Sequence, residues 1–137
     1  YIIIGGFIMS ELNNTATSIG NYNNVPTSLT SNTSVVNMVE GLSLTKEADK
    51  DNWVSGYLTY TITLDNATDT TYEHPVITDV LDNTLVEFVN DSVTIDGVKA
   101  ETSKYNYDEG SHTLTVNLDD VSHSGSTTLT FLVTKKA

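Results

Sequence analysis

The sequence predicts an all-β protein whose larger part is an immunoglobulin-like antiparallel β-sandwich, and three observations support this prediction. First, residues 56–64 alternate between two phases, one of which carries Leu58, Tyr60, Ile62 and Leu64. A period of two in β-branched and aromatic residues indicates a half-buried strand. Second, short segments of the same kind recur over about 100 residues, a spacing typical of such sandwiches. Third, Asp96-Gly97 separates two of these segments with the strongest two-residue hairpin signal in the chain.

The remaining elements follow in order. Leu42-Ser-Leu-Thr-Lys46 is expected to be a short strand, and the polar loop after it leads to Trp53, which should cap one end of the core. Tyr105 and Tyr107 are placed in a loop beside residues 108–110. Further strands are expected over 75–81, 92–95, 98–100, 113–118 and 127–133, with a short apolar piece at 86–89 and loops or turns at 65–71, 82–83 and 124–125.

Residues 1–40 are expected to form an N-terminal extension to a domain spanning residues 41–137. Residues 10–40 are rich in Asn, Thr and Ser and could not bury enough apolar surface to order alone. Segments 12–19 and 34–39 nevertheless have strand character, and the seven residues 20–26 have turn chemistry. Two interpretations stay open: a flexible linker, or a hairpin that folds only against something else.

The first eight residues are apolar but have neither a basic region nor a small-residue cleavage site, so a signal peptide is not expected. Met9-Ser10-Glu11 resembles a natural start. Residues 1–8 are then either an upstream artefact, which we favour, or an extra strand.

Composition excludes several classes of partner. The chain has 6 Lys and Arg against 18 Asp and Glu, a formal charge of −12, which disfavours nucleic acid and anionic membranes. It has no cysteine, so neither disulfides nor thiolate metal sites are expected. No stretch has transmembrane length, and no catalytic motif, cofactor-binding motif or small-molecule substrate site is recognisable. The expectation is a protein that is not an enzyme.

Four segments resemble the DUF11 repeat, the conserved repeat domain of bacterial surface proteins. They are Leu-Ser-Leu-Thr-Lys-Glu-Ala-Asp at 42–49, Tyr-Leu-Thr-Tyr-Thr-Ile-Thr-Leu at 57–64, Val-Ile-Thr-Asp-Val-Leu at 76–81 and Thr-Leu-Thr-Phe-Leu-Val-Thr at 128–134. The resemblance covers residues 42–134, with departures at Asp65-Asn66 and at Asn83. It implies a β-sandwich on a bacterial surface.

The resemblance also implies that the repeat is cut out of frame. Motifs that follow the last strand in tandem repeats appear here at the front, as Asn14-Thr15-Ala16 and Ser31-Asn32-Thr33-Ser34-Val35. A sandwich without its final strands has an open edge, and an N-terminal segment carrying those strands can fill the edge of another copy. The expected partner is therefore the chain itself, in a head-to-tail homopolymer. The residues expected to form the donor strand are Leu12, Asn14, Ala16, Ile19, Val36 and Met38.

Three polar residues fall on apolar phases, and together they suggest a covalent cross-link. Lys46 is in step with Leu44, Asp79 with Ile77, and Asn14 with Leu12. An isopeptide bond needs a lysine held in its neutral form, an amide within reach and a protonated acid. In this interpretation Lys46 is the nucleophile, Asn14 the acceptor and Asp79 the acid. The simpler alternative is an ordinary Lys–Asp pair at the end of the sandwich.

Two functions remain as hypotheses. The favoured one is a structural fibre subunit, extracellular, on the surface of a bacterial cell or spore. The alternative is a monomeric adhesin or carbohydrate-binding module, for which Tyr105 and Tyr107 would be the exposed aromatic pair. A calcium site at Asp49, Asp51 and Asn52 and a metal site at His74, His112 or His123 are weaker candidates, because neither set has an ordered ligand spacing.

Overall fold

The structure is a computed structural model that describes residues 2–4 and 7–137, with side chains from Glu11 onward apart from that of Met38. The chain divides into two compact units, Tyr1–Glu40 and Gly41–Ala137. Within the described residues all regular structure is β-strand, except for one 3-10 turn at Thr102–Lys104. Every strand pair is antiparallel, so the all-β antiparallel prediction is confirmed.

The unit Gly41–Ala137, called the two-sheet unit below, contains a larger sheet centred on two long strands. These are β7 (Leu58–Asn66) and β14 (Ser126–Lys135), which pair over eight residues. The strand order is β11-β10-β14-β7-β6, and β9 also pairs with β14. The other members are β6 (Leu42–Ala48), β9 (Val86–Phe88), β10 (Thr94–Ile95) and β11 (Val98–Lys99).

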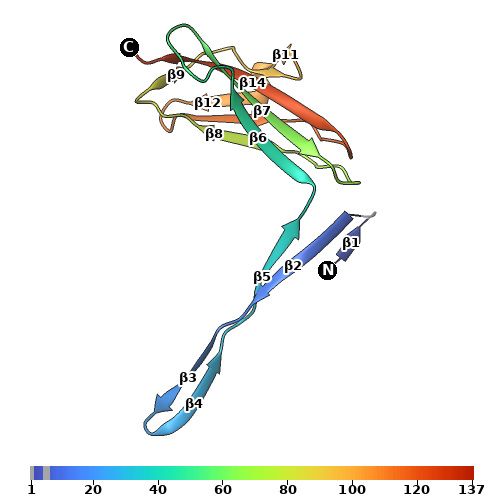
Figure 1. Cartoon of the computed structure of the whole chain (residues 1–137), viewed down its shortest axis with the longest axis vertical. Helices are drawn as coiled ribbons and strands as arrows, with labels where there is room; N and C mark the ends of the chain where they lie inside the picture. Colours follow the sequence, from blue (N-terminus) through green and yellow to red (C-terminus); the bar gives the residue numbers. More distant parts are fainter. Residues whose placement is uncertain (1, 5–6) are drawn as a thin grey trace. The chain divides into compact units, whose positions relative to one another are not determined.

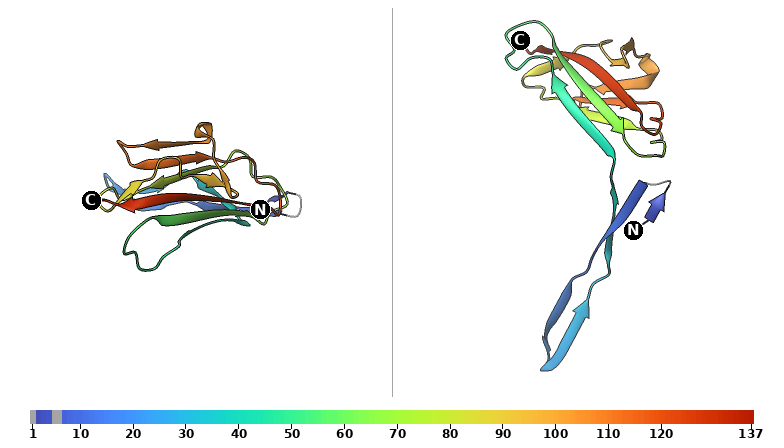
Figure 2. Two further views of the ribbon diagram at one scale, coloured as in Figure 1. Left: turned by 90° about the horizontal axis from the view of Figure 1, so that it is seen from above. Right: turned by 45° about the vertical axis from the view of Figure 1, so that its right-hand side comes forward.

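The second sheet has three strands, in the order β12-β13-β8. They are β8 (Val76–Val80), β12 (Tyr105–Asp108) and β13 (Thr113–Asn117). Figures 1 and 2 show this sheet as a second layer against the face of β7 and β14. Side chains from both layers form one core, so the arrangement is consistent with a β-sandwich.

The two-residue alternation of apolar side chains along the strands explains which residues form the core. Alternate positions of β7, β13 and β14 are buried, and Phe131, Val116 and Val133 are fully enclosed. Trp53 is partly buried and packs against this core. The buried hydrophobic residues are Leu58, Ile62, Leu64, Ile77, Leu81, Val93, Ala100, Leu114, Val116, Leu118, Val121, Leu129, Phe131 and Val133.

The hairpin predicted at Asp96-Gly97 is confirmed. Both residues have positive φ, 50° and 81°, and Ile95 pairs with Val98 across them. Two adjacent residues with positive φ define a type I′ turn, whose twist matches the flanking strands. Glycine at the second position takes this conformation without a steric penalty.

The prediction that Tyr105 and Tyr107 lie in a loop is wrong. Both lie in β12, which pairs with β13 from Tyr105–Val116 to Asp108–Thr113. Both rings are half-buried and pack against the core, and Tyr107 stacks on Phe88 with ring centroids 4.7 Å apart. Burial raises the pKa of both hydroxyls. Because these rings are packed inward, they do not form an exposed aromatic pair.

The first unit is a long antiparallel ribbon made of β2 (Phe7–Asn14), β3 (Thr17–Tyr22), β4 (Val25–Thr30) and β5 (Ser34–Val39). We call β2–β3 its first arm and β4–β5 its second arm. Strand β2 pairs with β5, and β3 pairs with β4; the short strand β1 (Ile2–Ile4) pairs with the outer edge of β2. Residues 10–40 therefore form a hairpin, whereas part of residues 1–8 lies outside the described residues.

The turn of this hairpin is narrower than predicted. Only Asn23 and Asn24 form it, with φ of 50° and 66°, whereas the sequence indicated a turn over all of 20–26. Asparagine tolerates the left-handed region better than other non-glycine residues, which suits this two-residue connection. The flanking residues, Tyr22 and Val25, are already paired as strand.

A β-bulge divides the ribbon into two halves. Thr17 pairs with Thr30, but Asn14 pairs with Ser34, so two residues of the first arm face three of the second. At the bulge the Ala16 amide donates to Ser31 Oγ at 3.0 Å, and the Ser31 amide donates to the Ala16 carbonyl at 2.9 Å. Because of the extra residue, even-numbered residues of the first arm pair with even-numbered residues in β5 but with odd-numbered residues in β4.

Candidate strand-binding groove and lysine–aspartate pair

Strand β6 lies at an edge of the larger sheet and turns apolar side chains toward an uncovered part of the core. Its even-numbered residues pair with the buried phase of β7: Leu44 opposite Leu64, and Lys46 opposite Ile62. Leu44 is on this inward phase, yet it is 56% exposed. An inward-facing leucine can be this exposed only where the opposite layer does not cover it.

Strand β8 lies at an edge of the smaller sheet. Its inward positions are Ile77, opposite the buried Val116, and Asp79, opposite the buried Leu114. Strand β13 is its only strand partner among the described residues. The backbone groups on the free side of β8 are therefore available to another strand.

Between these two edges lies an apolar groove with a volume of about 220 Å³. Leucine side chains from β6 and β7 line one wall, and residues of β8 with Tyr72 line the other. The lining residues are Leu42, Ser43, Leu44, Leu64, Tyr72, Val76 and Ile77. The groove thus exposes apolar surface between two free strand edges, the kind of site to which an extended segment can add.

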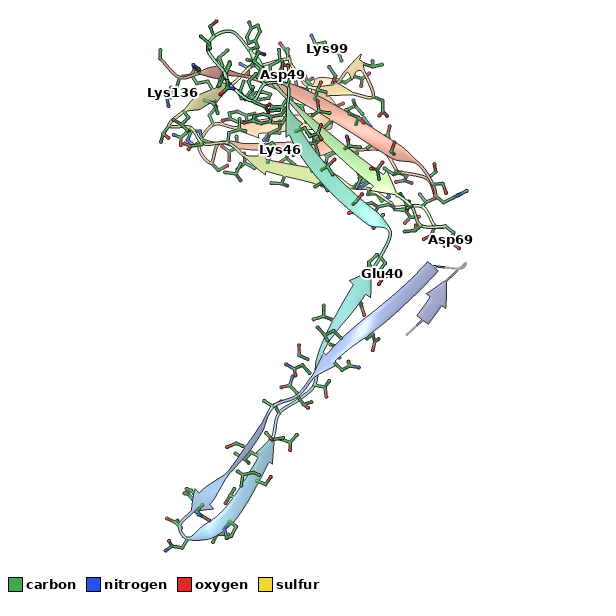
Figure 3. All side chains as sticks on the ribbon, viewed as in Figure 1. Glu40, Lys46, Asp49, Asp69, Lys99 and Lys136 are labelled. Carbon is green, nitrogen blue, oxygen red and sulfur yellow. The ribbon has the colours of Figure 1, made fainter. Side chains whose placement is uncertain are left out.

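Lys46 and Asp79 join the two edges. Lys46 Nζ lies 2.8 Å from Asp79 Oδ2, with the lysine side chain 40% exposed and the aspartate side chain 10% exposed. Lys46 is labelled on β6 in Figure 3. Asp79 Oδ2 is buried, and no hydrogen bond of normal geometry from another described residue reaches it. Its close partner is thus the lysine alone, which leaves this oxygen with unused acceptor capacity.

Two aromatic rings lie against the lysine head group. Lys46 Nζ is 4.3 Å from the centroid of the Tyr60 ring and 6.0 Å from that of Phe131. The two rings are themselves in contact, 5.5 Å apart and tilted. Sequence reasoning identified Lys46 and Asp79 but missed these rings. The signal was present, because Tyr60 and Phe131 occupy inward phases of adjacent strands.

Asn14, the third residue expected in this group, belongs to the ribbon. It pairs with Ser34 and is exposed. The even-numbered positions of the first arm also include Leu12, opposite Val36. Met38 occupies the position opposite Ser10 on the same register phase. Ile19 lies beyond the bulge, in β3, at an odd-numbered position opposite Ser28.

The ribbon exposes apolar side chains without a core of its own. Because of the bulge, the even positions of the first arm pair with odd positions of β4 and with even positions of β5. These positions include the pair Leu12–Val36 before the bulge and the pairs Ser18–Leu29 and Tyr22–Val25 after it, and the apolar members of all three are more than half exposed. A two-stranded ribbon of this kind is marginally stable in water by itself.

Asn66, the most deeply buried polar residue of the two-sheet unit, has a structural role. Asn66 donates to the carbonyls of Thr70 and Val121 at 2.8 and 3.0 Å, and its oxygen accepts from the Thr68 amide and hydroxyl. All of its bonding capacity is used, so Asn66 is not a free amide for chemistry. Among the described residues no group of three or more His, Asp or Glu side chains is arranged to hold a metal ion.

Comparisons with known proteins return no match, whether to family models, to curated proteins or to solved structures. Helices long and apolar enough to cross a membrane are absent from the described part of the chain.

Proposed function

We propose that this chain is the structural subunit of a fibre, in which the ribbon of one copy adds strands to the two-sheet unit of the next. The groove between β6 and β8 is the observation that carries the proposal. It combines exposed inward-phase leucine with two free strand edges. Removing that apolar surface from water and pairing those edges both favour an added strand.

An immunoglobulin-like assignment of the strands supports the same idea. With β6, β7, β8 and β14 taken as strands A, B, C and E, the free side of β8 is where strand F pairs in such a sandwich, with G beside it. A two-stranded antiparallel ribbon has the form of an F–G pair. The resemblance to DUF11 repeats, whose last hairpin has similar motifs, points the same way.

Charge makes the ribbon a suitable occupant. Its charged side chains are Glu11 and Glu40, so residues 41–137 carry 6 basic and 18 − 2 = 16 acidic residues. A copy of the two-sheet unit would repel another copy of itself, but it would repel a nearly neutral ribbon much less. Glu11 pairs with Asn37 on the odd-numbered phase, which leaves the phase of Leu12 and Val36 free of charge.

Pro26 indicates which arm would pair with β8. In a hairpin with a two-residue turn, Tyr22 and Val25 exchange hydrogen bonds, so the next position of the second arm, Pro26, faces outward. Proline has no amide hydrogen, so this outer edge cannot donate at that position. The outer edge of β3 has no such interruption, and β1 covers the outer edge of β2 only at residues 7–9. We therefore propose that the first arm pairs with the free edge of β8. The second arm then lies on the side of the groove nearer β6.

Ribbon and groove are different surfaces, so the contact is heterologous and propagates from copy to copy as a filament. We propose that such a fibre lies on the outside of a bacterial cell or spore, and the resemblance to bacterial surface repeats supports an extracellular location. The alternative, an adhesin or carbohydrate-binding module, has less support because Tyr105 and Tyr107 are packed against the core.

Deleting residues 1–40 tests the proposal. The remaining two-sheet unit should form no filaments in electron micrographs, but it should bind an added peptide that spans residues 10–40. Full-length protein under the same conditions should form filaments. Filaments from the truncated chain would show that the ribbon is not the donor, and failure to bind the peptide would show that the groove is not its acceptor.

A further inference from the structure

We infer that Lys46 and Asp79 form a docking-triggered cross-linking site, which joins Lys46 of one copy to the side-chain amide of Asn14 from another. This inference rests on the proposed function, because it takes the ribbon as the occupant of the groove. It adds a covalent reaction and assigns a role to each of three residues.

The two-sheet unit already holds two of the three groups such a reaction needs. The amine and the acid are 2.8 Å apart, on inward phases of the two edges that border the groove. The carboxylate oxygen that faces the lysine is buried and otherwise unbonded, so it is free to carry a proton. The ring faces of Tyr60 and Phe131 lie on one side of the Lys46 head group.

The missing group is an amide, and the two-sheet unit does not supply it at this place. Asn66, its fully buried asparagine, is committed to four hydrogen bonds, and it pairs with Leu42 at the other end of β6. On the ribbon, Asn14 is a polar residue on the even-numbered phase that carries Leu12 and Val36. If that phase docks along the inward faces of β6 and β8, which border the groove, the Asn14 amide lies on the same side of these strands as Lys46.

Docking itself would trigger the reaction. In the open unit the Lys46 side chain is 40% exposed, so water stabilises the ion pair and the ammonium cannot act as a nucleophile. A docked strand covers the pair, and removing water disfavours both charges. One proton then moves from Lys46 Nζ to Asp79 Oδ2, which leaves a neutral amine beside a neutral carboxylic acid.

The reaction balances without any further reagent. Lys46 Nζ attacks Cγ of Asn14, and the carboxylic acid of Asp79 donates a hydrogen bond to the amide oxygen, which becomes negative. Asp79 next takes a proton from the attacking nitrogen while its original proton passes to the departing NH₂ group. The C–NH₂ bond breaks, ammonia leaves, and the new Nζ–Cγ bond is an ordinary amide. Asp79 ends protonated, so the ammonium, the carboxylate and the asparagine amide have become one new amide, one ammonia and one carboxylic acid.

The test uses the full-length protein, assembled and then boiled in denaturant. A ladder of oligomers should survive, each junction lighter by one ammonia, and proteolysis should release a branched peptide that joins position 46 to position 14. Lys46→Arg keeps the positive charge but cannot act as a neutral nucleophile, so its filaments should dissolve to monomer. Asp79→Asn and Asn14→Ala should also abolish the ladder. The matched controls Lys50→Arg, Asp119→Asn and Asn13→Ala should keep it.

Each outcome decides between the two proposals. Filaments that dissolve wholly to unmodified monomer would overturn the cross-link and leave strand donation standing. A monomer lighter by one ammonia would show a bond within one chain and overturn the bond between copies. If the full-length protein forms neither filaments nor the branched peptide, both proposals are wrong. A branched peptide that joins Lys46 to a residue other than Asn14 would overturn the assignment of the acceptor.

Discussion

Lys46 Nζ lies 2.8 Å from Asp79 Oδ2, but the two partners of this ion pair differ in exposure: the lysine side chain is 40% exposed and the aspartate side chain 10%. The lysine head group can turn to water if its partner is removed, because its aliphatic stem can stay on the apolar surface. The aspartate oxygen is buried and cannot do the same. Removal of the two partners should therefore have unequal costs.

We predict that Lys46→Met destabilises the two-sheet unit by about 1–3 kcal/mol, because it leaves a buried carboxylate without its counter-charge. Asp79→Asn should cost about 1 kcal/mol or less, since the remaining charge is more than a third exposed. Urea unfolding of each single variant and of the double variant measures both costs and their coupling. Equal costs, or a larger cost for Asp79→Asn, would contradict the assigned difference in burial.

A second prediction concerns the stability of the two-sheet unit at low pH. Asp49 accepts a hydrogen bond from the Thr59 amide at 2.9 Å and a second from Lys50 Nζ, and these bonds lower the pKa of its carboxyl below 3.8. A carboxyl whose pKa is lower in the folded state contributes stability above its unfolded pKa and loses that contribution as the pH falls through the folded value. Hydrogen bonds lower the pKa of Asp82 and Asp108 in the same direction.

The two-sheet unit should therefore lose stability steadily as the pH falls below about 4. Asp49→Asn should reduce this slope, because an amide does not titrate. The measurement is the urea midpoint at a series of pH values. Asp51→Asn removes a charge from the same loop and serves as the control. An identical slope in the wild-type protein and in Asp49→Asn would show that the Thr59 bond does not stabilise the ionised form.

Regular alternation was enough to predict which residues point inward. Lys46 and Asp79 each sit on a two-residue period with apolar neighbours, and the register of β6 with β7 and of β8 with β13 agrees with that phase. Whether a strand is central or at an edge depends on partners far away in sequence. The sequence could therefore indicate that Leu44 faces inward, but not that no second layer covers it.

The errors have local causes. The segment that forms β12 has only two apolar residues, Tyr105 and Tyr107, and the Asp108-Glu109-Gly110 stretch after it has loop chemistry. Its strand conformation comes from pairing with β13, a tertiary effect that composition does not show. At the ribbon tip, Gly20 and Pro26 also suggested a turn, but both residues are paired in strands.

A third prediction tests the face of the ribbon that docks. Leu12 and Asn13 are adjacent and exposed, and they lie on opposite phases, opposite Val36 and Val35. Leu12→Asp should abolish filament formation, because docking would bury an unpaired carboxylate at a cost of several kcal/mol. Asn13→Asp adds the same charge on the outward phase and should assemble nearly as the wild type does. Electron micrographs at matched concentrations measure both, and equal effects would contradict the assigned phase.

The last prediction tests the groove and then combines the two surfaces. Leu44 on β6 and Val98 on β11 are both exposed apolar residues on edge strands, 56% and 70% exposed. Leu44→Asp should block assembly, whereas Val98→Asp, away from the groove, should not. Both substitutions should change the stability of the subunit itself by only about 0.5 kcal/mol, because more than half of each side chain is already exposed to water.

The Leu44→Asp chain keeps a working ribbon with a blocked groove, and the Leu12→Asp chain keeps a working groove with a blocked ribbon. Neither variant should assemble alone. Mixed in equal amounts they should form a one-to-one complex and stop, because a heterologous contact needs one intact surface from each copy and neither free end can extend it. Light scattering after size exclusion would resolve this dimer from monomer and from filaments. Filaments in the mixture, or no complex at all, would show that ribbon and groove are not the two halves of one contact.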